Sequence, residues 1–291
     1  MIWSRVTIVG LGLIGGSLGL ALKRAANPAH HLPELRVSGY DQSAAARQLA
    51  LASGAIDVAP GNLVDAAREA ELVIIAVPVL GIHDVFAALG PVLQPGAVVT
   101  DVAGTKALVC AWAAELLPCA FVGGHPMAGS ERSGMAHARA DLFDGATYCL
   151  TPTEDTPQTA IAAVTQLIEI VGARPALMDP ATHDRVVAAV SHLPFLLSTL
   201  LVELTTASPE WDLLRTLAAT GFRDVSRLAS GDARMHTDIC LTNATAIRPW
   251  LRDAARMLET LADELDDATA LQQRFEHAKA ARDDLLAGDA T

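Results

Sequence analysis

The sequence predicts an α/β domain over residues 1–179, followed by an all-helical domain over residues 180–291. Three observations predict this organisation. Strand-like and helix-like segments alternate through the first part of the chain, a glycine-rich loop follows the first strand, and strand signals stop at about Pro180. With 291 residues, the chain is also long enough for two hydrophobic cores.

The expected strands are short runs rich in β-branched residues. Residues 5–10 (RVTIVG) form the first strand and residues 16–25 the first helix. Strand signals recur at residues 35–41, 71–78, 97–104, 121–126, 146–152 and 174–179, with helical periodicity at residues 43–55 and 156–173. This alternation predicts a parallel sheet with right-handed crossovers and helices on both faces.

Helical periodicity then continues to the C-terminal end, with breaks at residues 208–211 and 219–224. Residues 186–202 carry no charge and approach the length of a membrane span, but they include Ser191, His192 and Pro194. We expect a buried helix, shared between two subunits, in a protein that binds no membrane. The helical domain therefore predicts a homodimer.

Charge and cysteine usage restrict the partners and the compartment. The formal net charge is −12 and no lysine- or arginine-rich run occurs, so we expect no nucleic-acid partner. The four cysteines are scattered, without a C-x-x-C pair or a histidine at ligand spacing. This pattern favours reduced thiols in a cytoplasmic protein and predicts no metal site.

The glycine-rich loop matches the dinucleotide-binding pattern G-x-G-x-x-G. Gly10 permits a tight turn, Gly12 lets a pyrophosphate approach the backbone, and Gly15 lets the helix pack against the strand. Leu13 and Ile14 open the helix whose N-terminal N–H groups would hold the phosphates. A glycine-rich turn without a ligand is the alternative, but the strand before the loop and the helix after it favour a Rossmann-type domain.

Asp41 ends the second strand, where a carboxylate can accept hydrogen bonds from both ribose hydroxyls of a dinucleotide. It would repel a 2′-phosphate, and the nearest cation after it is Arg47. The sequence therefore predicts NAD rather than NADP. Val77 and Pro78 end the third strand and are expected beside the adenine or the ribose.

His125 stands in FVGGHPMAGSERSG (residues 121–134), at the expected carboxyl end of a strand. Doubly wound sheets bind their ligands at this edge. A histidine that only caps a turn is the alternative. However, an imidazole is well suited to take a hydroxyl proton during hydride transfer. We expect the neighbouring glycines to clear room for cofactor and substrate.

Five segments, in order, resemble the prephenate/arogenate (cyclohexadienyl) dehydrogenases of tyrosine biosynthesis. They are GLGLIGGSLGLALK, DVAGTK, GGHPMAGSERSG, THDRVVAAVSHLP and GFRDVSRLASGD. The resemblance spans the chain to about Asn243 and implies a nucleotide-binding domain followed by a helical dimerisation domain. It also implies that prephenate or arogenate transfers a hydride to NAD and loses carbon dioxide, giving 4-hydroxyphenylpyruvate or tyrosine.

The resemblance assigns the catalytic residues by matching position. His125 would assist deprotonation of the ring hydroxyl, and Arg227 would bind the substrate carboxylate through a planar guanidinium. Ser130 would add a hydroxyl to the substrate site. Glu131 and Asp224 match acidic residues that resemble an ionic gate with Arg227, or alternatively they are simple salt-bridge partners.

The sequence departs from the family pattern at three positions. A serine common in the DVAGTK segment is Gly104 here, so we place Gly104 at the cofactor and expect Thr105 to supply a substrate-side hydroxyl. Phe195 stands in place of a second histidine of SHLPH, and His236 in place of a tryptophan. These changes leave the reaction type intact and leave the choice between prephenate and arogenate open.

Two histidines of the helical domain keep alternative interpretations. His192 is either a ligand-facing residue of the substrate site or a packing residue, and His183 is a cap or hinge residue. The rival functions are a β-hydroxyacid or imine reductase of the same architecture, and a nucleotide sensor without catalysis. The leading hypothesis requires His125 and Arg227 to converge on one pocket, within a subunit or across the dimer.

Overall fold

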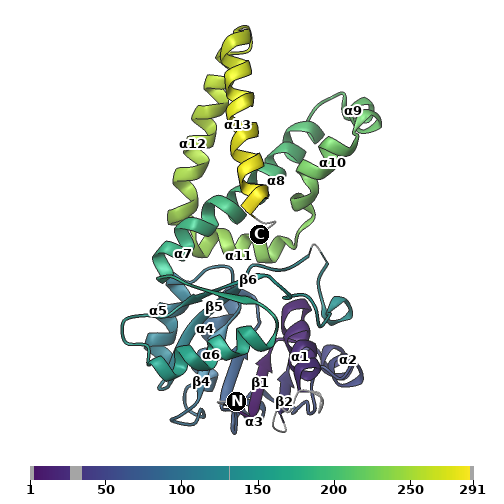
Figure 1. Ribbon diagram of the computed structural model, residues 1–291. Coiled ribbons are helices and arrows are strands. Elements are labelled where there is room, and N and C mark those ends of the chain that lie inside the picture. Colours follow the sequence, from purple (N-terminus) through teal and green to yellow (C-terminus); the bar gives the residue numbers. More distant parts are fainter. Residues whose placement is uncertain (1–2, 27–34, 131, 289–291) are drawn as a thin grey trace. The chain divides into compact units, whose positions relative to one another are not determined.

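The computed structural model describes residues 3–26, 35–130 and 132–288 (Figure 1). The chain divides into two compact units, Met1–Ala246 and Ile247–Thr291. The sheet, its covering helices and every helix through α11 belong to the first unit.

The first unit contains a seven-stranded sheet in the order β2-β1-β3-β4-β5-β6-β7. Its strands are β1 (Arg5–Val9), β2 (Arg36–Tyr40), β3 (Leu72–Ile75), β4 (Val98–Asp101), β5 (Ala120–Pro126), β6 (Thr147–Thr151) and β7 (Arg174–Leu177). The first five strands are parallel, which confirms the predicted doubly wound α/β class.

The expectation of an entirely parallel sheet is wrong at β6. This strand runs antiparallel to β5, with His125 opposite Cys149, and β7 then pairs with β6 in parallel. Among the described residues between β5 and β6, the structure shows a short 3₁₀ turn, η3 (Met135–His137), and no crossover helix. A parallel neighbour is usually reached through a helix that packs on a face of the sheet, and without such a helix β6 pairs antiparallel to β5.

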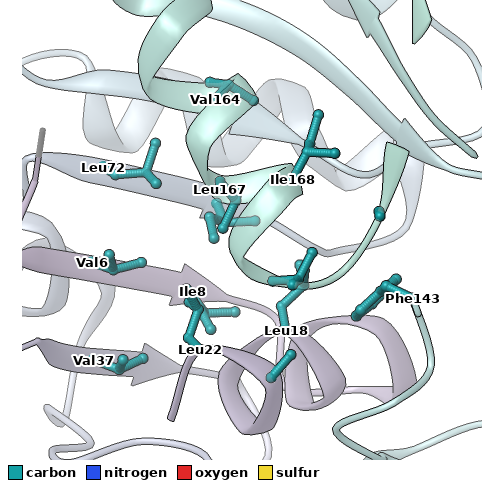
Figure 2. Close-up of a cluster of buried hydrophobic side chains, with 14 of the residues drawn as sticks. Val6, Ile8, Leu18, Leu22, Val37, Leu72, Phe143, Val164, Leu167 and Ile168 are labelled. Atoms are coloured by element: carbon teal, nitrogen blue, oxygen red, sulfur yellow. The ribbon is translucent and has the colours of Figure 1, made fainter. Parts of the chain in front are cut away.

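Helices cover both faces of the sheet because alternate residues of each central strand point to opposite sides. On one face, α1 (Leu13–Ala25) and α6 (Gln158–Ile170) cover Val6, Ile8 and Leu72 (Figure 2). On the other face, α4 (Ile82–Leu89) and α5 (Ala107–Leu116) cover Val9, Val73 and Ile75. The shorter elements are α2 (Ala44–Ala52), α3 (Leu63–Ala67) and η2 (Val79–Gly81).

The rest of the first unit is helical, as predicted. It comprises α7 (Pro180–Val187), the π-helical turn η4 (Ala188–His192), α8 (Leu193–Thr206), α9 (Trp211–Leu217), α10 (Thr220–Ser226), the 3₁₀ turn η5 (Arg227–Ser230) and α11 (Ala233–Thr242). Beyond Leu177, no strand occurs in the part of the chain that the structure describes.

The first three of these elements form one helical run, Pro180–Thr206, long and apolar enough by length and composition to cross a membrane. Only 28% of its most apolar stretch is buried inside the chain. Within a single chain the helix is therefore mostly uncovered, and its burial between two subunits stays a prediction. Val190 (63% exposed) and Leu204 (71%) project away from the remainder of the unit, leaving an apolar surface for another partner to cover.

The second unit contains most of α12 (Ala244–Asp263) and all of α13 (Ala268–Gly288). Within this unit, the Arg274 guanidinium donates to the Glu264 carboxylate at 2.5 Å across the turn between the two helices. Leu258 and Phe275 are more than 60% exposed, so this pair of helices also carries uncovered apolar side chains.

Candidate functional site

Packing within the protein requires glycine at two positions of the glycine-rich loop, Gly10 and Gly15, but not at the third, Gly12. Gly10 has φ +96°, and a Cβ there would lie 2.3 Å from the carbonyl oxygen of Ala76. A Cβ on Gly15 would lie 1.9 Å from the oxygen of Gly10. A Cβ on Gly12 would meet no protein atom within 4 Å. Because protein packing does not explain Gly12, its open surface fits the close approach of a phosphate group to the start of α1.

Asp41 lies next to this loop and organises it. Its Oδ2 accepts the Leu11 N–H at 2.8 Å, and its Oδ1 accepts the Ser43 N–H at 2.8 Å. A carboxylate has about four acceptor positions, so both oxygens can still accept hydroxyl donors. The residue predicted to bind the ribose therefore also fixes the loop that is predicted to bind the phosphates.

Four further residues predicted to contact the cofactor lie at the same edge of the sheet. Leu13 and Ile14 are the first residues of α1 and are half-buried. Val77 and Pro78 follow β3, and the Val77 nitrogen would lie 3.0 Å from a Cβ on Gly10. The structure thus gathers the predicted cofactor residues at the carboxyl ends of β1, β2 and β3.

His125 stands near the end of β5 and belongs to a chain of three side chains. Its Nδ1 lies 2.9 Å from His183 Nε2, and His183 Nδ1 lies 2.9 Å from Asp184 Oδ1. Since the carboxylate can only accept, these partners assign the Nδ1 proton of His183 to Asp184. His183 Nε2 then accepts from the Nδ1–H of His125. The Nε2 of His125 keeps its lone pair, which is the tautomer that a general base needs.

Asp184 fixes this chain to the sheet domain. It also accepts the backbone N–H groups of Lys106 at 2.7 Å and Ala107 at 2.9 Å. These donors begin α5, where unpaired N–H groups favour a negative charge. Asp184 and His183 are buried, so the helical segment and the sheet segment meet at a buried junction behind His125. Figure 1 shows α7, which carries His183 and Asp184, beside this edge of the sheet.

Burial and the neighbouring Lys106 cation keep His125 uncharged. Burial lowers the pKa of His125 well below its usual value, and His183, Lys106 and His192 lower it further. Burial also lowers the pKa of His192, to about 4. His125 is therefore neutral at neutral pH and able to accept a proton.

Gly104 lies opposite the free nitrogen of His125. A Cβ on Gly104 would lie 3.8 Å from His125 Nε2 and 3.5 Å from the Ile239 side chain. His192 is 1% exposed, and its ring nitrogens are used inside the protein. Its Nδ1 lies 3.2 Å from Asn243 Nδ2, and it shares a hydrogen bond with the Gly104 backbone. These contacts favour the packing alternative for His192, with the ring holding Gly104 in place.

Thr105, the expected source of a substrate-side hydroxyl, is fully buried. Its Oγ1 lies 3.0 Å from Thr242 Oγ1 of α11. The hydroxyl therefore links the loop after β4 to the helical segment, and the substrate contact expected for Thr105 has no geometric support.

The two departures from the family pattern in the helical segment contact each other. The rings of Phe195 and His236 stack with centroids 4.1 Å apart and an interplanar angle of 2°. Phe195 also lies 6.0 Å from the His192 ring. The two departures are therefore coupled, because the Phe195 and His236 rings stack on each other and Phe195 lies beside the buried His192.

The predicted substrate residues of the helical segment lie on α10 and η5. Arg227 begins η5 and Asp224 lies one turn earlier on α10, and both are exposed. The Ala229 N–H donates to Ser198 Oγ at 3.0 Å, which seats η5 on α8. Glu131 lies outside the described residues. Convergence of His125 and Arg227 on one pocket stays a prediction.

Ser130 and the glycine-rich loop share a cavity of about 270 Å³, which also includes Arg132 and Arg139 in its lining. A larger hollow of about 760 Å³ lies at the amino ends of the strands, beside Arg5 and Glu71. We assign the ligand site to the side of the smaller cavity, because Leu13 of the glycine-rich segment and Ser130 line it. Among the described side chains, no group of three or more His, Cys, Asp or Glu is arranged to hold a metal ion.

His183 and Asp184 are the site residues that sequence reasoning missed. From the sequence, His183 is expected to be a cap or hinge residue, and no role is assigned to Asp184. Only the tertiary contact with β5 distinguishes a histidine that orients another histidine from one that ends a turn. The acidic residue directly after the histidine was the available signal.

The doubly wound sheet, the open glycine-rich loop and the neutral histidine at the same sheet edge define a nucleotide-binding domain of the dehydrogenase type. Comparison with known proteins agrees. Residues 19–177 match the model of the prephenate dehydrogenase nucleotide-binding domain, and residues 179–277 match the model of the prephenate dehydrogenase dimerization domain. The chain belongs to the prephenate dehydrogenase family.

Individual relatives match over nearly the whole chain. A prephenate dehydrogenase of Bacillus subtilis is 37% identical, covering 96% of this chain and 76% of its own. A cyclohexadienyl dehydrogenase of Zymomonas mobilis is 32% identical, covering 97% and 96%. The crystal structure of prephenate dehydrogenase from Aquifex aeolicus in complex with hydroxyphenyl propionate and NAD+ is 29% identical, with a TM-score of 0.89 over 97% of this chain and 98% of its own.

Proposed function

We propose that this protein catalyses the NAD-dependent oxidative decarboxylation of prephenate to 4-hydroxyphenylpyruvate, or of arogenate to tyrosine, in tyrosine biosynthesis. The observation that carries the proposal is the Asp184–His183–His125 chain at the ligand-binding edge of the sheet. Its hydrogen bonds occupy Nδ1 of His125 and leave Nε2 unprotonated. The family relationship supplies the substrate class.

The residues at the glycine-rich loop fit a dinucleotide. The N-terminal N–H groups of α1 and the open surface of Gly12 suit a pyrophosphate, and the carboxylate of Asp41 suits ribose hydroxyls. When bound, NAD supplies the hydride acceptor. Asp41 disfavours the 2′-phosphate of NADP through charge repulsion, so we propose a preference for NAD.

His125 holds and then accepts the proton of the substrate's ring hydroxyl at Nε2. His183 and Asp184 stabilise the imidazolium that forms, because the positive charge is shared along a chain that ends in a carboxylate. Loss of the ring carboxylate as carbon dioxide then restores aromaticity. Aromatisation drives the reaction, so the side chains mainly supply orientation and charge placement.

Arg227 binds a substrate carboxylate through two parallel hydrogen bonds. Support comes from its position on η5, which is seated at Ser198 of α8. Asp224 and Glu131 are proposed to gate this arginine, and Ser130 to contact the substrate.

We further propose a cytoplasmic homodimer with a domain boundary near residue 179. The match to a dimerization domain over residues 179–277 supports both the assembly and the boundary. The exposed apolar side chains of α8 support a second copy of the chain, rather than a membrane or nucleic acid, as the partner that covers them.

The test is NADH formation by the purified protein with prephenate or arogenate, and with NAD or NADP in parallel. The proposal predicts turnover of prephenate with NAD and a higher kcat/KM for NAD than for NADP. Absence of turnover with either substrate by a protein that binds NAD would contradict it. A preference for NADP would contradict only the role given to Asp41.

A further inference from the structure

Gly124, directly before His125, lies where the sheet stops supporting β5 on one side. The parallel pairing of β4 with β5 ends at Thr100 opposite Val122. From Gly123 onward, β5 pairs with β6 alone. The backbone of Gly124, the residue that precedes His125, therefore has no strand partner on the β4 side.

A buried ion pair replaces the missing strand partner. Asp101 Oδ1 accepts the Gly124 N–H at 3.0 Å, and Lys106 Nζ donates to the Gly124 carbonyl oxygen at 2.7 Å. Lys106 Nζ also pairs with Asp101 Oδ2, and both side chains are 0% exposed. Both hydrogen-bonding groups of one peptide residue are thus held by a single ion pair, which we call the Gly124 clamp.

The two glycines before His125 make room for this clamp. A Cβ on Gly124 would lie 2.6 Å from the Asp101 carbonyl oxygen, and one on Gly123 would lie 2.3 Å from Thr151 Oγ1 and 3.2 Å from Lys106 Cδ. The expectation that these glycines clear space for cofactor and substrate is therefore wrong. They admit protein atoms that fix the strand.

Lys106 also reaches the other support of His125, because its backbone N–H donates to Asp184 Oδ1 at 2.7 Å. Replacing a buried ion pair by uncharged side chains of similar volume is often neutral or stabilising, so stability alone does not explain why the chain uses one here. We propose that Lys106 and Asp101 are positioning residues that hold the His125 imidazole against His183 in the geometry for proton transfer. This inference rests on the proposed role of His125.

The test is the double variant Lys106→Met/Asp101→Asn, which removes both charges with little change in volume. We expect kcat for NADH formation to fall about 10- to 100-fold, since a displacement of about 1 Å costs roughly 100-fold. We expect the KM for prephenate and the Kd of NAD to stay within about twofold. The matched control Lys23→Met/Asp57→Asn removes another Lys–Asp pair, partly exposed and distant in sequence from β5, and should keep wild-type kcat.

A pH profile separates positioning from a merely structural role. The charged or titratable groups around His125 are His183 of α7 with Asp184 behind it, Lys106 paired with Asp101, and His192 of η4. Removing the Lys106 cation moves the acidic limb of kcat/KM to higher pH, because a group that lowers the pKa of His125 is lost. A folded double variant with kcat within twofold of wild type and an unshifted profile would overturn the inference.

Two further variants keep the result decisive. If the double variant does not fold by circular dichroism, Asp101→Asn alone keeps the side-chain volume and should still lower kcat with an unchanged KM. Wild-type kcat in that variant would also overturn the inference. His125→Asn is measured in parallel. If His125→Asn retains wild-type turnover, the proposed function is contradicted. If His125→Asn loses its turnover while the Lys106 and Asp101 variants stay fully active, only the role proposed for the Gly124 clamp is contradicted.

Discussion

Substitution of Gly12 by alanine tests whether the glycine-rich loop is shaped by a ligand. The new Cβ meets no protein atom within 4 Å, and Gly12 has φ −81°, which other residues adopt. The free energy of unfolding should therefore change by less than about 1 kcal/mol. The Cβ would instead occupy the space assigned to the pyrophosphate. We expect the Kd of NAD to rise about 10- to 100-fold, which corresponds to about 1.4–2.8 kcal/mol.

Gly15→Ala is the matched control in the same loop. Its Cβ would lie 1.9 Å from the Gly10 oxygen and 3.1 Å from the Ala76 side chain, so the loop and β3 must shift. Overpacking of this kind costs about 1–3 kcal/mol, or about 2–4 °C in Tm for each kcal/mol. Thermal unfolding without ligand and calorimetric titration with NAD measure the two effects separately. A Gly12→Ala protein that binds NAD with wild-type affinity would refute the assignment of the pyrophosphate to this loop.

The remaining predictions concern the substrate carboxylate, cofactor choice and pH. Arg227→Ala should raise the KM for prephenate by at least about tenfold with a smaller effect on kcat, since the contact exists already in the ground state; an unchanged KM would exclude the proposed contact. Asp41→Ser should raise kcat/KM with NADP relative to NAD, because the repulsion of a 2′-phosphate is removed; an unaltered ratio would remove Asp41 from cofactor choice. The pKa of His192 falls from 6.5 to about 4 on folding, so the unfolded chain binds the proton first. The stability that this histidine contributes is present above pH 6.5 and is lost as the pH falls towards 4, by at most roughly 3 kcal/mol. Urea unfolding between pH 7 and pH 4.5 should show this loss, and a His192→Gln variant with the same pH dependence as wild type would contradict it.

The order of elements in the sheet domain follows from local patterns. A fully apolar run such as residues 72–75 is typical of a central parallel strand covered on both faces, and the structure buries every residue of β3. The reversal of β6 was not predictable from strand periodicity, because periodicity carries no direction. The described residues of the connection after β5 form a 3₁₀ turn and no crossover helix, and β6 runs antiparallel to β5.

One part of the candidate site could be predicted from the sequence and another part could not. The glycine-rich loop was predictable because its function depends on a fixed spacing of three glycines within one strand–helix turn. The support of His125 was not, because His183 and Lys106 reach it from 58 residues after and 19 residues before in the chain. Residues that bind a ligand leave a local pattern, whereas residues that orient them are recognised only by their contacts.

His125→Asn tests the central claim most directly, with kcat for NADH formation from prephenate and the Kd of NAD measured on the same folded protein. Loss of the Nε2 lone pair should lower kcat by about two to four orders of magnitude and leave the Kd of NAD within about twofold of wild type. A variant that turns over at the wild-type rate would contradict the assignment of His125 as the group that takes the substrate proton.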